Sequence, residues 1–128
     1  MRDTDTKYAN KLIYVAEDDE YSFILIKEFL SGTGFKIEHA VNGDILVDMV
    51  KKKVPDVILL DINMPQKNGL NALKEIRSLG VNVPVIAETA YAMPDERQLI
   101  MDSGCDEYIS KPIYKLQLIN LIDKVLQK

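Results

Sequence analysis

Short apolar runs alternate along the chain with longer stretches in which apolar residues recur at helical spacing. The apolar runs predict five β-strands, at residues 12–16, 35–40, 57–61, 83–89 and 107–110. The longer stretches predict five α-helices, at residues 20–31, 44–52, 70–79, 94–103 and 115–126. Strict alternation of strands and helices is typical of a doubly wound α/β fold, in which helices cover both faces of a parallel sheet.

The residues at the ends of these elements agree with the division. The run 57–60 is apolar throughout, as expected of a strand that is buried on both faces. Pro94 suits the first turn of the fourth helix, and Gly80 and Gly104 follow the third and fourth helices. We therefore predict one domain over residues 11–128, preceded by a flexible extension at residues 1–10.

Composition and charge narrow the classes of protein. The 128 residues are 47% hydrophobic and carry a net charge of −4, which suits a globular domain and argues against nucleic acid as a direct partner. The sequence has no signal peptide and no apolar stretch long enough to cross a membrane. Cys105 is the only cysteine, which favours a reducing, cytoplasmic location, and His39 is the only histidine, so no zinc cluster is expected. We assign both residues to structure.

Polar residues stand at the carboxyl ends of four predicted strands. Glu17 and Asp18 follow the first strand, Asp61 ends the third, Thr89 ends the fourth and Lys111 follows the fifth. Open parallel sheets bind their ligands at this edge. Carboxylates suit Mg²⁺, whereas a hydroxyl and an ammonium group suit phosphoryl oxygens. The set indicates phosphoryl transfer to Asp61 with Mg²⁺ as cofactor.

The same residues lie in four characteristic stretches: 16–20 (AEDDE), 59–65 (LLDINMP, followed by Gly69), 88–90 (ETA) and 108–112 (YISKP). In order, spacing and placement they resemble the receiver domain of the two-component response-regulator family, over about residues 11–127. The resemblance implies a flavodoxin-like (βα)5 fold with a five-stranded sheet in the order 2-1-3-4-5.

The resemblance also implies a role for each acid. Asp61 would accept a phosphoryl group from a phosphohistidine on a sensor histidine kinase or a histidine phosphotransfer protein. Asp18 would bind Mg²⁺ directly and Glu17 mainly through water, and the backbone carbonyl of Asn63 would be a further ligand. A domain of this kind catalyses its own phosphorylation and dephosphorylation.

A switch is implied in the same way. Lys111 would pair with Asp61 and then with the phosphoryl group, which Thr89 would hydrogen-bond, and Tyr108 would turn inward when Thr89 shifts. The peptide bond between Lys111 and Pro112 is expected to be cis. The altered surface would lie around the fourth and fifth helices, and the fourth helix, fifth strand and fifth helix form a candidate homodimer contact.

One residue departs from the family pattern. Glu88 stands where the family more often has an apolar or amide side chain. Because neighbouring residues of a strand face opposite ways, we expect Glu88 to point to solvent, away from the metal site; the alternative is that it tunes the loop after the fourth strand. Tyr91 would either obstruct the hydrolytic water and prolong phosphorylation, or simply pack beside the fourth helix. Asn63 is a second candidate for tuning dephosphorylation.

Other functions are weighed against a signalling receiver. A Mg²⁺-dependent phosphohydrolase with an Asp nucleophile would place a second acid two residues later, where this chain has Asn63. A flavodoxin-like cofactor module would have a phosphate loop after the first strand. A degenerate receiver, acting only as a binding module, would not need Asp61, Thr89 and Lys111. The stretch 84–93 resembles the receivers of hybrid histidine kinases, which favours a domain of a larger kinase. A stand-alone regulator is the alternative.

Overall fold

A computed structural model describes residues 7–64, 68–90 and 93–127. Strands and helices alternate along it as the apolar pattern predicts. The strands are β1 (Leu12–Ala16), β2 (Lys36–Ala40), β3 (Val57–Asp61), β4 (Val85–Thr89) and β5 (Glu107–Ser110). The helices are α1 (Glu20–Leu30), α2 (Gly43–Lys52), α3 (Gly69–Ser78), α4 (Pro94–Asp102) and α5 (Lys115–Leu126). The predicted helix ends differ from these by at most one residue, whereas β2 begins one residue and β4 two residues later than predicted.

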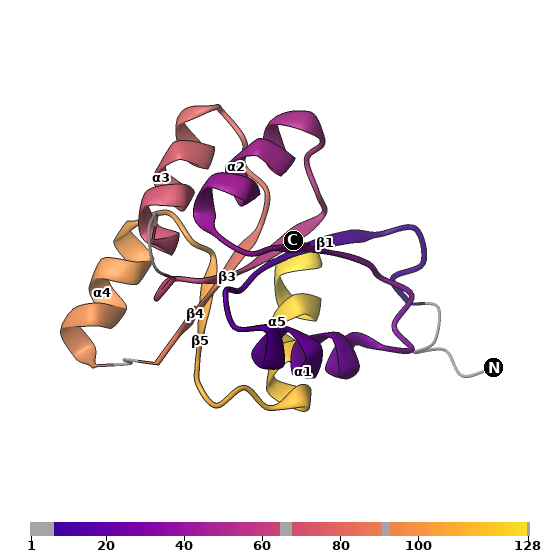
Figure 1. Ribbon diagram of the computed structural model, residues 1–128. Helices are drawn as coiled ribbons and strands as arrows, with labels where there is room; N and C mark the ends of the chain where they lie inside the picture. The colour runs from indigo at the N-terminus through magenta and orange to yellow at the C-terminus, as the bar shows by residue number, and fades with distance from the viewer. Residues whose placement is uncertain (1–6, 65–67, 91–92, 128) are drawn as a thin grey trace.

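The strands form one parallel sheet in the order β2-β1-β3-β4-β5. Helices α1 and α5 cover one face, and α2, α3 and α4 cover the other (Figure 1). The predicted doubly wound fold and its strand order are therefore confirmed. The chain leaves β1 toward β2 on one side, whereas β3 lies on the other side of β1. Such a reversal of direction opens a crevice at the carboxyl ends of β1 and β3.

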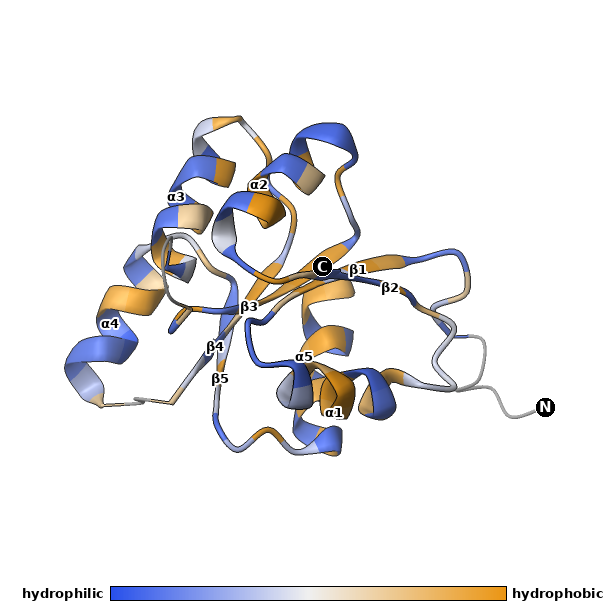
Figure 2. Cartoon of the chain, viewed as in Figure 1, coloured by the Kyte–Doolittle hydropathy of each residue, from blue (hydrophilic) through white to orange (hydrophobic). Residues whose placement is uncertain are grey.

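The core consists of two apolar layers, one on each face of the sheet. Every residue of β1, β3 and β4 is buried. Leu46 and Leu73 belong to the layer beneath α2 and α3, and Ile26 and Ile122 belong to the layer beneath α1 and α5. In Figure 2 the central strands are largely hydrophobic, while the helices mix hydrophobic and hydrophilic residues. No helix in the described part of the chain is long and apolar enough to cross a membrane.

Residues 7–10, which the sequence assigns to a flexible extension, form a turn against the domain. Tyr8 is buried and stacks on Phe35, with ring centroids 4.6 Å apart. Its hydroxyl donates a hydrogen bond to Asp123 on α5, and burial together with this carboxylate raises the pKa of Tyr8 above its ordinary value. The packed part of the chain thus begins before β1; residues 1–6 lie outside the described ranges.

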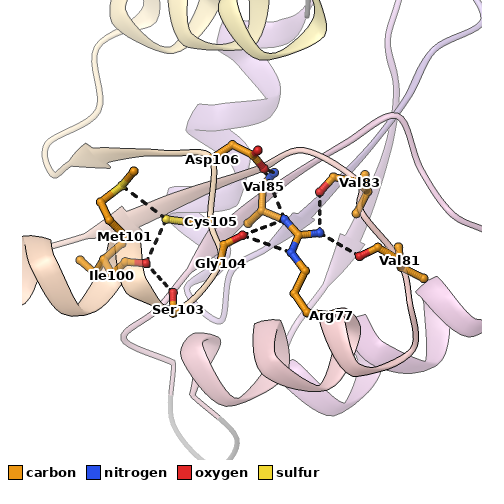
Figure 3. Close-up of polar contacts among 10 residues, drawn as sticks. All are labelled: Arg77, Val81, Val83, Val85, Ile100, Met101, Ser103, Gly104, Cys105 and Asp106. Atoms are coloured by element: carbon orange, nitrogen blue, oxygen red, sulfur yellow. Dashed lines mark hydrogen bonds and ion pairs between the residues drawn. The ribbon is translucent and has the colours of Figure 1, made fainter.

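Arg77 joins three segments at the edge of the sheet where β4 and β5 begin (Figure 3). It lies near the end of α3, and its guanidinium group donates to carbonyls of the segment before β4 and of the turn after α4. The acceptors are the oxygens of Val81 (3.0 Å), Val83 (2.8 Å) and Gly104 (3.1 Å from Nε and 2.9 Å from Nη2), and the carboxylate of Asp106 (3.3 Å). The Val83 carbonyl bonds to Arg77, so the segment before β4 is not part of the strand that its apolar sequence predicts.

A candidate phosphoacceptor site at the carboxyl edge

The topology gathers the predicted site residues at one edge of the sheet. Glu17 follows β1, Asp61 ends β3 and Thr89 ends β4, and these three strands are neighbours. Lys111 follows β5, the next strand along. Glu17, Asp61 and Thr89 are all at most 1% exposed. Two acids are therefore buried together beside one lysine, an arrangement that is costly unless the charges are compensated.

Each oxygen of the Asp61 carboxylate has a partner among the described residues. Oδ1 accepts a hydrogen bond from the backbone N–H of Asn63 at 2.9 Å, and Oδ2 lies 3.2 Å from Nζ of Lys111. The predicted pairing of Lys111 with Asp61 is present, and the peptide bond from Lys111 to Pro112 is cis, as expected. The fixed orientation of the Asp61 side chain suits an acceptor group that must meet an incoming ligand in line.

Gly69 packs directly against the backbone of Asp61 and Ile62. A Cβ atom added to Gly69 would lie 2.6 Å from the backbone oxygen of Asp61 and 2.5 Å from Cα of Ile62. Both contacts are with backbone, so no side-chain rotation could relieve them. The start of α3 and the end of β3 approach this closely only because residue 69 is glycine.

Glu17 is held by backbone contacts on both sides. Its Oε2 accepts a hydrogen bond from the backbone N–H of Asp19 at 3.2 Å. Its carbonyl oxygen lies 2.7 Å from Nε2 of His39, whose ring stacks on Phe23 with centroids 3.7 Å apart. His39 contacts the backbone of the loop that carries Glu17, because β2 is the neighbour of β1.

Glu88 contradicts the prediction of a solvent-facing acid. It is 1% exposed, and its Oε1 lies 3.5 Å from Nζ of Lys111. The alternation of the strand holds, since Val85 and Ala87 pack in one core layer and Ile86 in the other. At the end of β4, however, the face of Ile86 is covered by α1 and by the segment after β5, which leaves Glu88 buried rather than exposed.

The carboxylates of Glu17, Asp61 and Glu88 form one cluster, in which the nearest oxygens lie within 4.8 Å of one another. Oε1 of Glu17 and Oε2 of Glu88 are buried and accept no hydrogen bond within the described residues. Buried oxygens without donors are what a hard cation requires of its ligands, so this donor set fits Mg²⁺.

The electrostatics of the cluster follow from its burial. Desolvation, helped by the charges of Glu88 and Asp61, raises the pKa of Glu17 to about 9. Burial also raises the pKa of Glu88, although the charge of Lys111 opposes this. Burial lowers the pKa of Lys111, but the three carboxylates outweigh it and leave that pKa above its ordinary value. Lys111 is therefore a cation at neutral pH.

Asp18, the predicted direct metal ligand, stands apart from this cluster. It is exposed, and it lines a separate cavity with side chains of α1 and β2, including His39. Of the predicted ligands, the structure brings together Glu17 and Asp61 and adds Glu88, which sequence reasoning had placed elsewhere. The relevant signal in the sequence was the position of Glu88 at the carboxyl end of a strand, next to Thr89.

The loops after β3 and β4 are tied together. Oδ1 of Asn63 accepts a hydrogen bond from the backbone N–H of Ala90 at 3.1 Å. The backbone N–H of Lys111 donates to the carbonyl of Thr89 at 2.8 Å, which links the loop after β5 to the same place. Tyr91 lies outside the described residues.

Tyr108, the predicted switch residue, is half-buried on β5. The guanidinium group of Arg97 on α4 lies 5.3 Å from the centre of its ring. Both residues line a small cavity between α4 and β5. The ring is thus packed beside α4 and remains partly accessible.

Comparisons with known proteins identify the family of this chain. Residues 13–123 match the model of the response regulator receiver domain. The chain belongs to this family. The receiver is 33% identical, over 91% of its length and 96% of the relative's, to the polar-differentiation response regulator DivK of Brucella anthropi.

Solved structures give the same result. The receiver domain of a sensor histidine kinase from Pseudomonas aeruginosa is 27% identical, with a TM-score of 0.85 over 92% of this chain and 98% of that one. That structure has a magnesium ion coordinated in its active-site cleft. The receiver domain of a Francisella response regulator is 28% identical, with a TM-score of 0.86 and the same coverage. The present receiver is accordingly a phosphorelay signalling domain. Members of its family interact with histidine kinases or phosphotransfer proteins.

Proposed function

We propose that Asp61 is the phosphoacceptor of this receiver and takes its phosphoryl group from a phosphohistidine. The observation that carries the proposal is the buried carboxylate of Asp61 at the end of β3, with the ammonium group of Lys111 at 3.2 Å. In the transfer, the bond between phosphorus and the imidazole nitrogen breaks and a bond from phosphorus to an Asp61 oxygen forms. The imidazole nitrogen keeps the electron pair.

Lys111 and Thr89 would hold the transferred group. Lys111 already faces Asp61 and, as a mobile point charge, can move onto a phosphoryl oxygen. Thr89 is buried at the end of the adjacent strand, where its hydroxyl can donate to a second oxygen. Because Lys111 and Thr89 are also linked through their backbones, a pull on one of them displaces the other.

The cation would lie beside the bare oxygen of Glu17 and the carboxylate of Asp61. Asp18 and the backbone carbonyl of Asn63 would complete the ligand set from the solvent side. Mg²⁺ bound there supplies positive charge that neutralises the phosphoryl oxygens during transfer. The chain's own residues fix the acceptor, exclude water from one side and provide the second cation, Lys111.

The phosphohistidine donor would be a sensor histidine kinase or a histidine phosphotransfer protein, docked over the start of α1. Tyr21, Ile24 and Leu25 are 78%, 53% and 44% exposed there, directly after the loop that carries Glu17. An apolar surface beside the acceptor is what a partner must cover to bring its histidine to Asp61. The free thiol of Cys105 agrees with a cytoplasmic encounter.

Phosphorylation would be read on the opposite flank, at α4, β5 and α5. Tyr108 and Arg97 meet there, and Leu99 and Leu116 are 59% and 75% exposed. A shift of Thr89 alters the loop that leads into α4 and thereby the packing of Tyr108. This surface is the one proposed for an output partner or for a second copy of the chain.

Mass spectrometry after incubation with acetyl phosphate and Mg²⁺ tests the proposal. The wild-type chain should gain one phosphoryl group, and Asp61→Asn should gain none. Asp48→Asn, which removes an exposed carboxylate from α2, is the matched control and should be phosphorylated like the wild type. Equal labelling of Asp61→Asn and wild type would place the phosphoryl group on another residue.

A further inference from the structure

Glu88 is a buried acid that the proposed phosphoryl transfer does not use. It lies at the carboxyl end of β4 with 1% of its surface exposed. One carboxylate oxygen lies 3.5 Å from Nζ of Lys111, and the other accepts no hydrogen bond within the described residues. Burying a carboxylate with an unpaired oxygen costs free energy. The charge of Glu88 therefore acts on the charged groups next to it.

The surroundings of Glu88 screen its charge only weakly. Glu88 and Lys111 line a cavity of about 190 Å³ whose other walls are mainly apolar side chains of α1 and of the segment after β5, among them Leu25, Ile26 and Ile113. Carboxylate oxygens of Glu88, Asp61 and Glu17 lie within 4.8 Å of one another. Charges that interact through apolar surroundings are screened far less than charges on the surface.

Lys111 is shared between two carboxylates in this structure. Its Nζ lies 3.2 Å from Asp61 and 3.5 Å from Glu88. A phosphoryl group on Asp61 needs the same ammonium group. If Lys111 moves to it, Glu88 loses its only ion-pair partner among the described residues, and a buried carboxylate is left beside an added dianion.

We infer that Glu88 is a fourth acid of the phosphoacceptor site, which strengthens the binding of a divalent cation and weakens the binding of the phosphoryl group. The inference rests on the proposed role of Asp61. Glu88 acts through charge: it attracts the cation that Glu17 and Asp61 bind, and it holds Lys111 back from the phosphoryl oxygens. It is a positioning residue for Lys111 and sets the balance between the two ligands.

The opposite signs of the two effects make the inference testable with one substitution. Glu88→Gln keeps the shape of the side chain and removes its charge. We expect the dissociation constant for Mg²⁺, measured alone by titration calorimetry, to rise about tenfold, since a charge within ~4–6 Å typically shifts such equilibria by about one pK unit. At saturating Mg²⁺, beryllofluoride, a phosphoryl analogue observed by fluorine NMR, should bind more tightly by a similar factor.

Control variants separate charge from structural damage. Glu28→Gln removes the same charge from an exposed position on α1 and should change neither constant. Glu88→Asp keeps the charge, so both dissociation constants should stay near their wild-type values. Weaker binding of both ligands by Glu88→Gln would show a structural role, and unchanged binding of both would show that the charge is not felt; either result overturns the inference.

The outcome for Glu88 can also be distinguished from failure of the proposed function. If the wild-type chain binds Mg²⁺ but neither beryllofluoride nor a phosphoryl group, then Asp61 is not the acceptor, and the inference for phosphoryl binding falls with it. If the wild type binds both ligands and Glu88→Gln shifts them in the same direction, the acceptor role stands and the role of Glu88 is refuted.

Discussion

The side-chain oxygen of Asn63 accepts a hydrogen bond from the backbone N–H of Ala90 and so bridges the loops after β3 and β4. One of these loops follows the acceptor Asp61 and the other follows Thr89. The backbone N–H of Asn63 meanwhile donates to Asp61. Asn63 therefore contacts both the acid that would receive the phosphoryl group and the loop that would respond to it.

Replacing Asn63 by alanine should loosen this bridge. The lost hydrogen bond is expected to cost about 1 kcal/mol of the free energy of unfolding, because a typical intramolecular hydrogen bond contributes roughly that much. Hydrogen exchange at the Ala90 amide, followed by NMR, should become faster. Asn120→Ala, at an exposed position on α5, should leave that exchange rate unchanged. An unchanged rate in Asn63→Ala would mean that the bridge is not formed in solution.

Replacing Gly69 by alanine should disturb both stability and phosphorylation. The new methyl group would meet the backbone of Asp61 and Ile62, and forcing extra atoms into packed regions costs typically about 1–3 kcal/mol. Chemical denaturation and labelling by acetyl phosphate measure the two effects.

Gly80→Ala is the informative control for this change. Gly80 has φ = +81°, but a Cβ atom there meets nothing within 4 Å. That variant should lose stability through backbone strain of roughly 1–2 kcal/mol and keep normal phosphorylation. Normal labelling of Gly69→Ala would show that the Asp61 loop can absorb the added methyl group.

Replacing Arg77 by alanine should lower stability without weakening the site. Its guanidinium group satisfies carbonyls from two segments, and hydrogen bonds to charged groups contribute about 1.5–3 kcal/mol. We expect a loss of roughly 2–4 kcal/mol in the free energy of unfolding, measured by urea denaturation. Lys74→Ala, an exposed change on the same helix, should cost well under 1 kcal/mol. A loss of acetyl phosphate labelling in folded Arg77→Ala would contradict the separation of the two edges.

Cys105 should react slowly with thiol reagents while the protein is folded. Burial raises the pKa of its thiol to about 11, so the reactive thiolate is scarce at neutral pH, and only 8% of the residue is exposed. The rate of reaction with a disulfide reagent should increase as the pH rises toward that pKa. It should also increase in urea and in Arg77→Ala, since Arg77 holds the adjacent Gly104. Fast labelling at pH 7 in the native protein would refute the burial.

Most of the fold could be predicted from the sequence, because alternating strands and helices leave few topologies open. Asp61, Thr89 and Lys111 could be placed for the same reason: parallel strands in a known order bring their carboxyl ends together. The start of β4 was harder to predict, since Val83 is apolar enough for a strand. Its carbonyl instead accepts a hydrogen bond from the side chain of Arg77, a contact that the apolar pattern does not record.

Glu88 marks the limit of pattern reasoning. Alternation correctly separates it from Thr89, but it does not say whether the opposite face is open or covered. That depends on how α1 and the segment after β5 pack, which is a property of the whole fold. The packing of Tyr8 against α5 escaped prediction for the same reason, because its partners Phe35 and Asp123 lie far along the chain.

The contact between His39 and the carbonyl of Glu17 has a practical consequence. His39 is the only histidine in the chain, so its ring protons give a single isolated set of NMR signals in unlabelled protein. Those signals come from a ring seated against the loop that bears an acid of the site. Their movement on adding a cation or a phosphoryl donor would follow occupancy in real time, without a fluorophore, an isotope or an engineered tag.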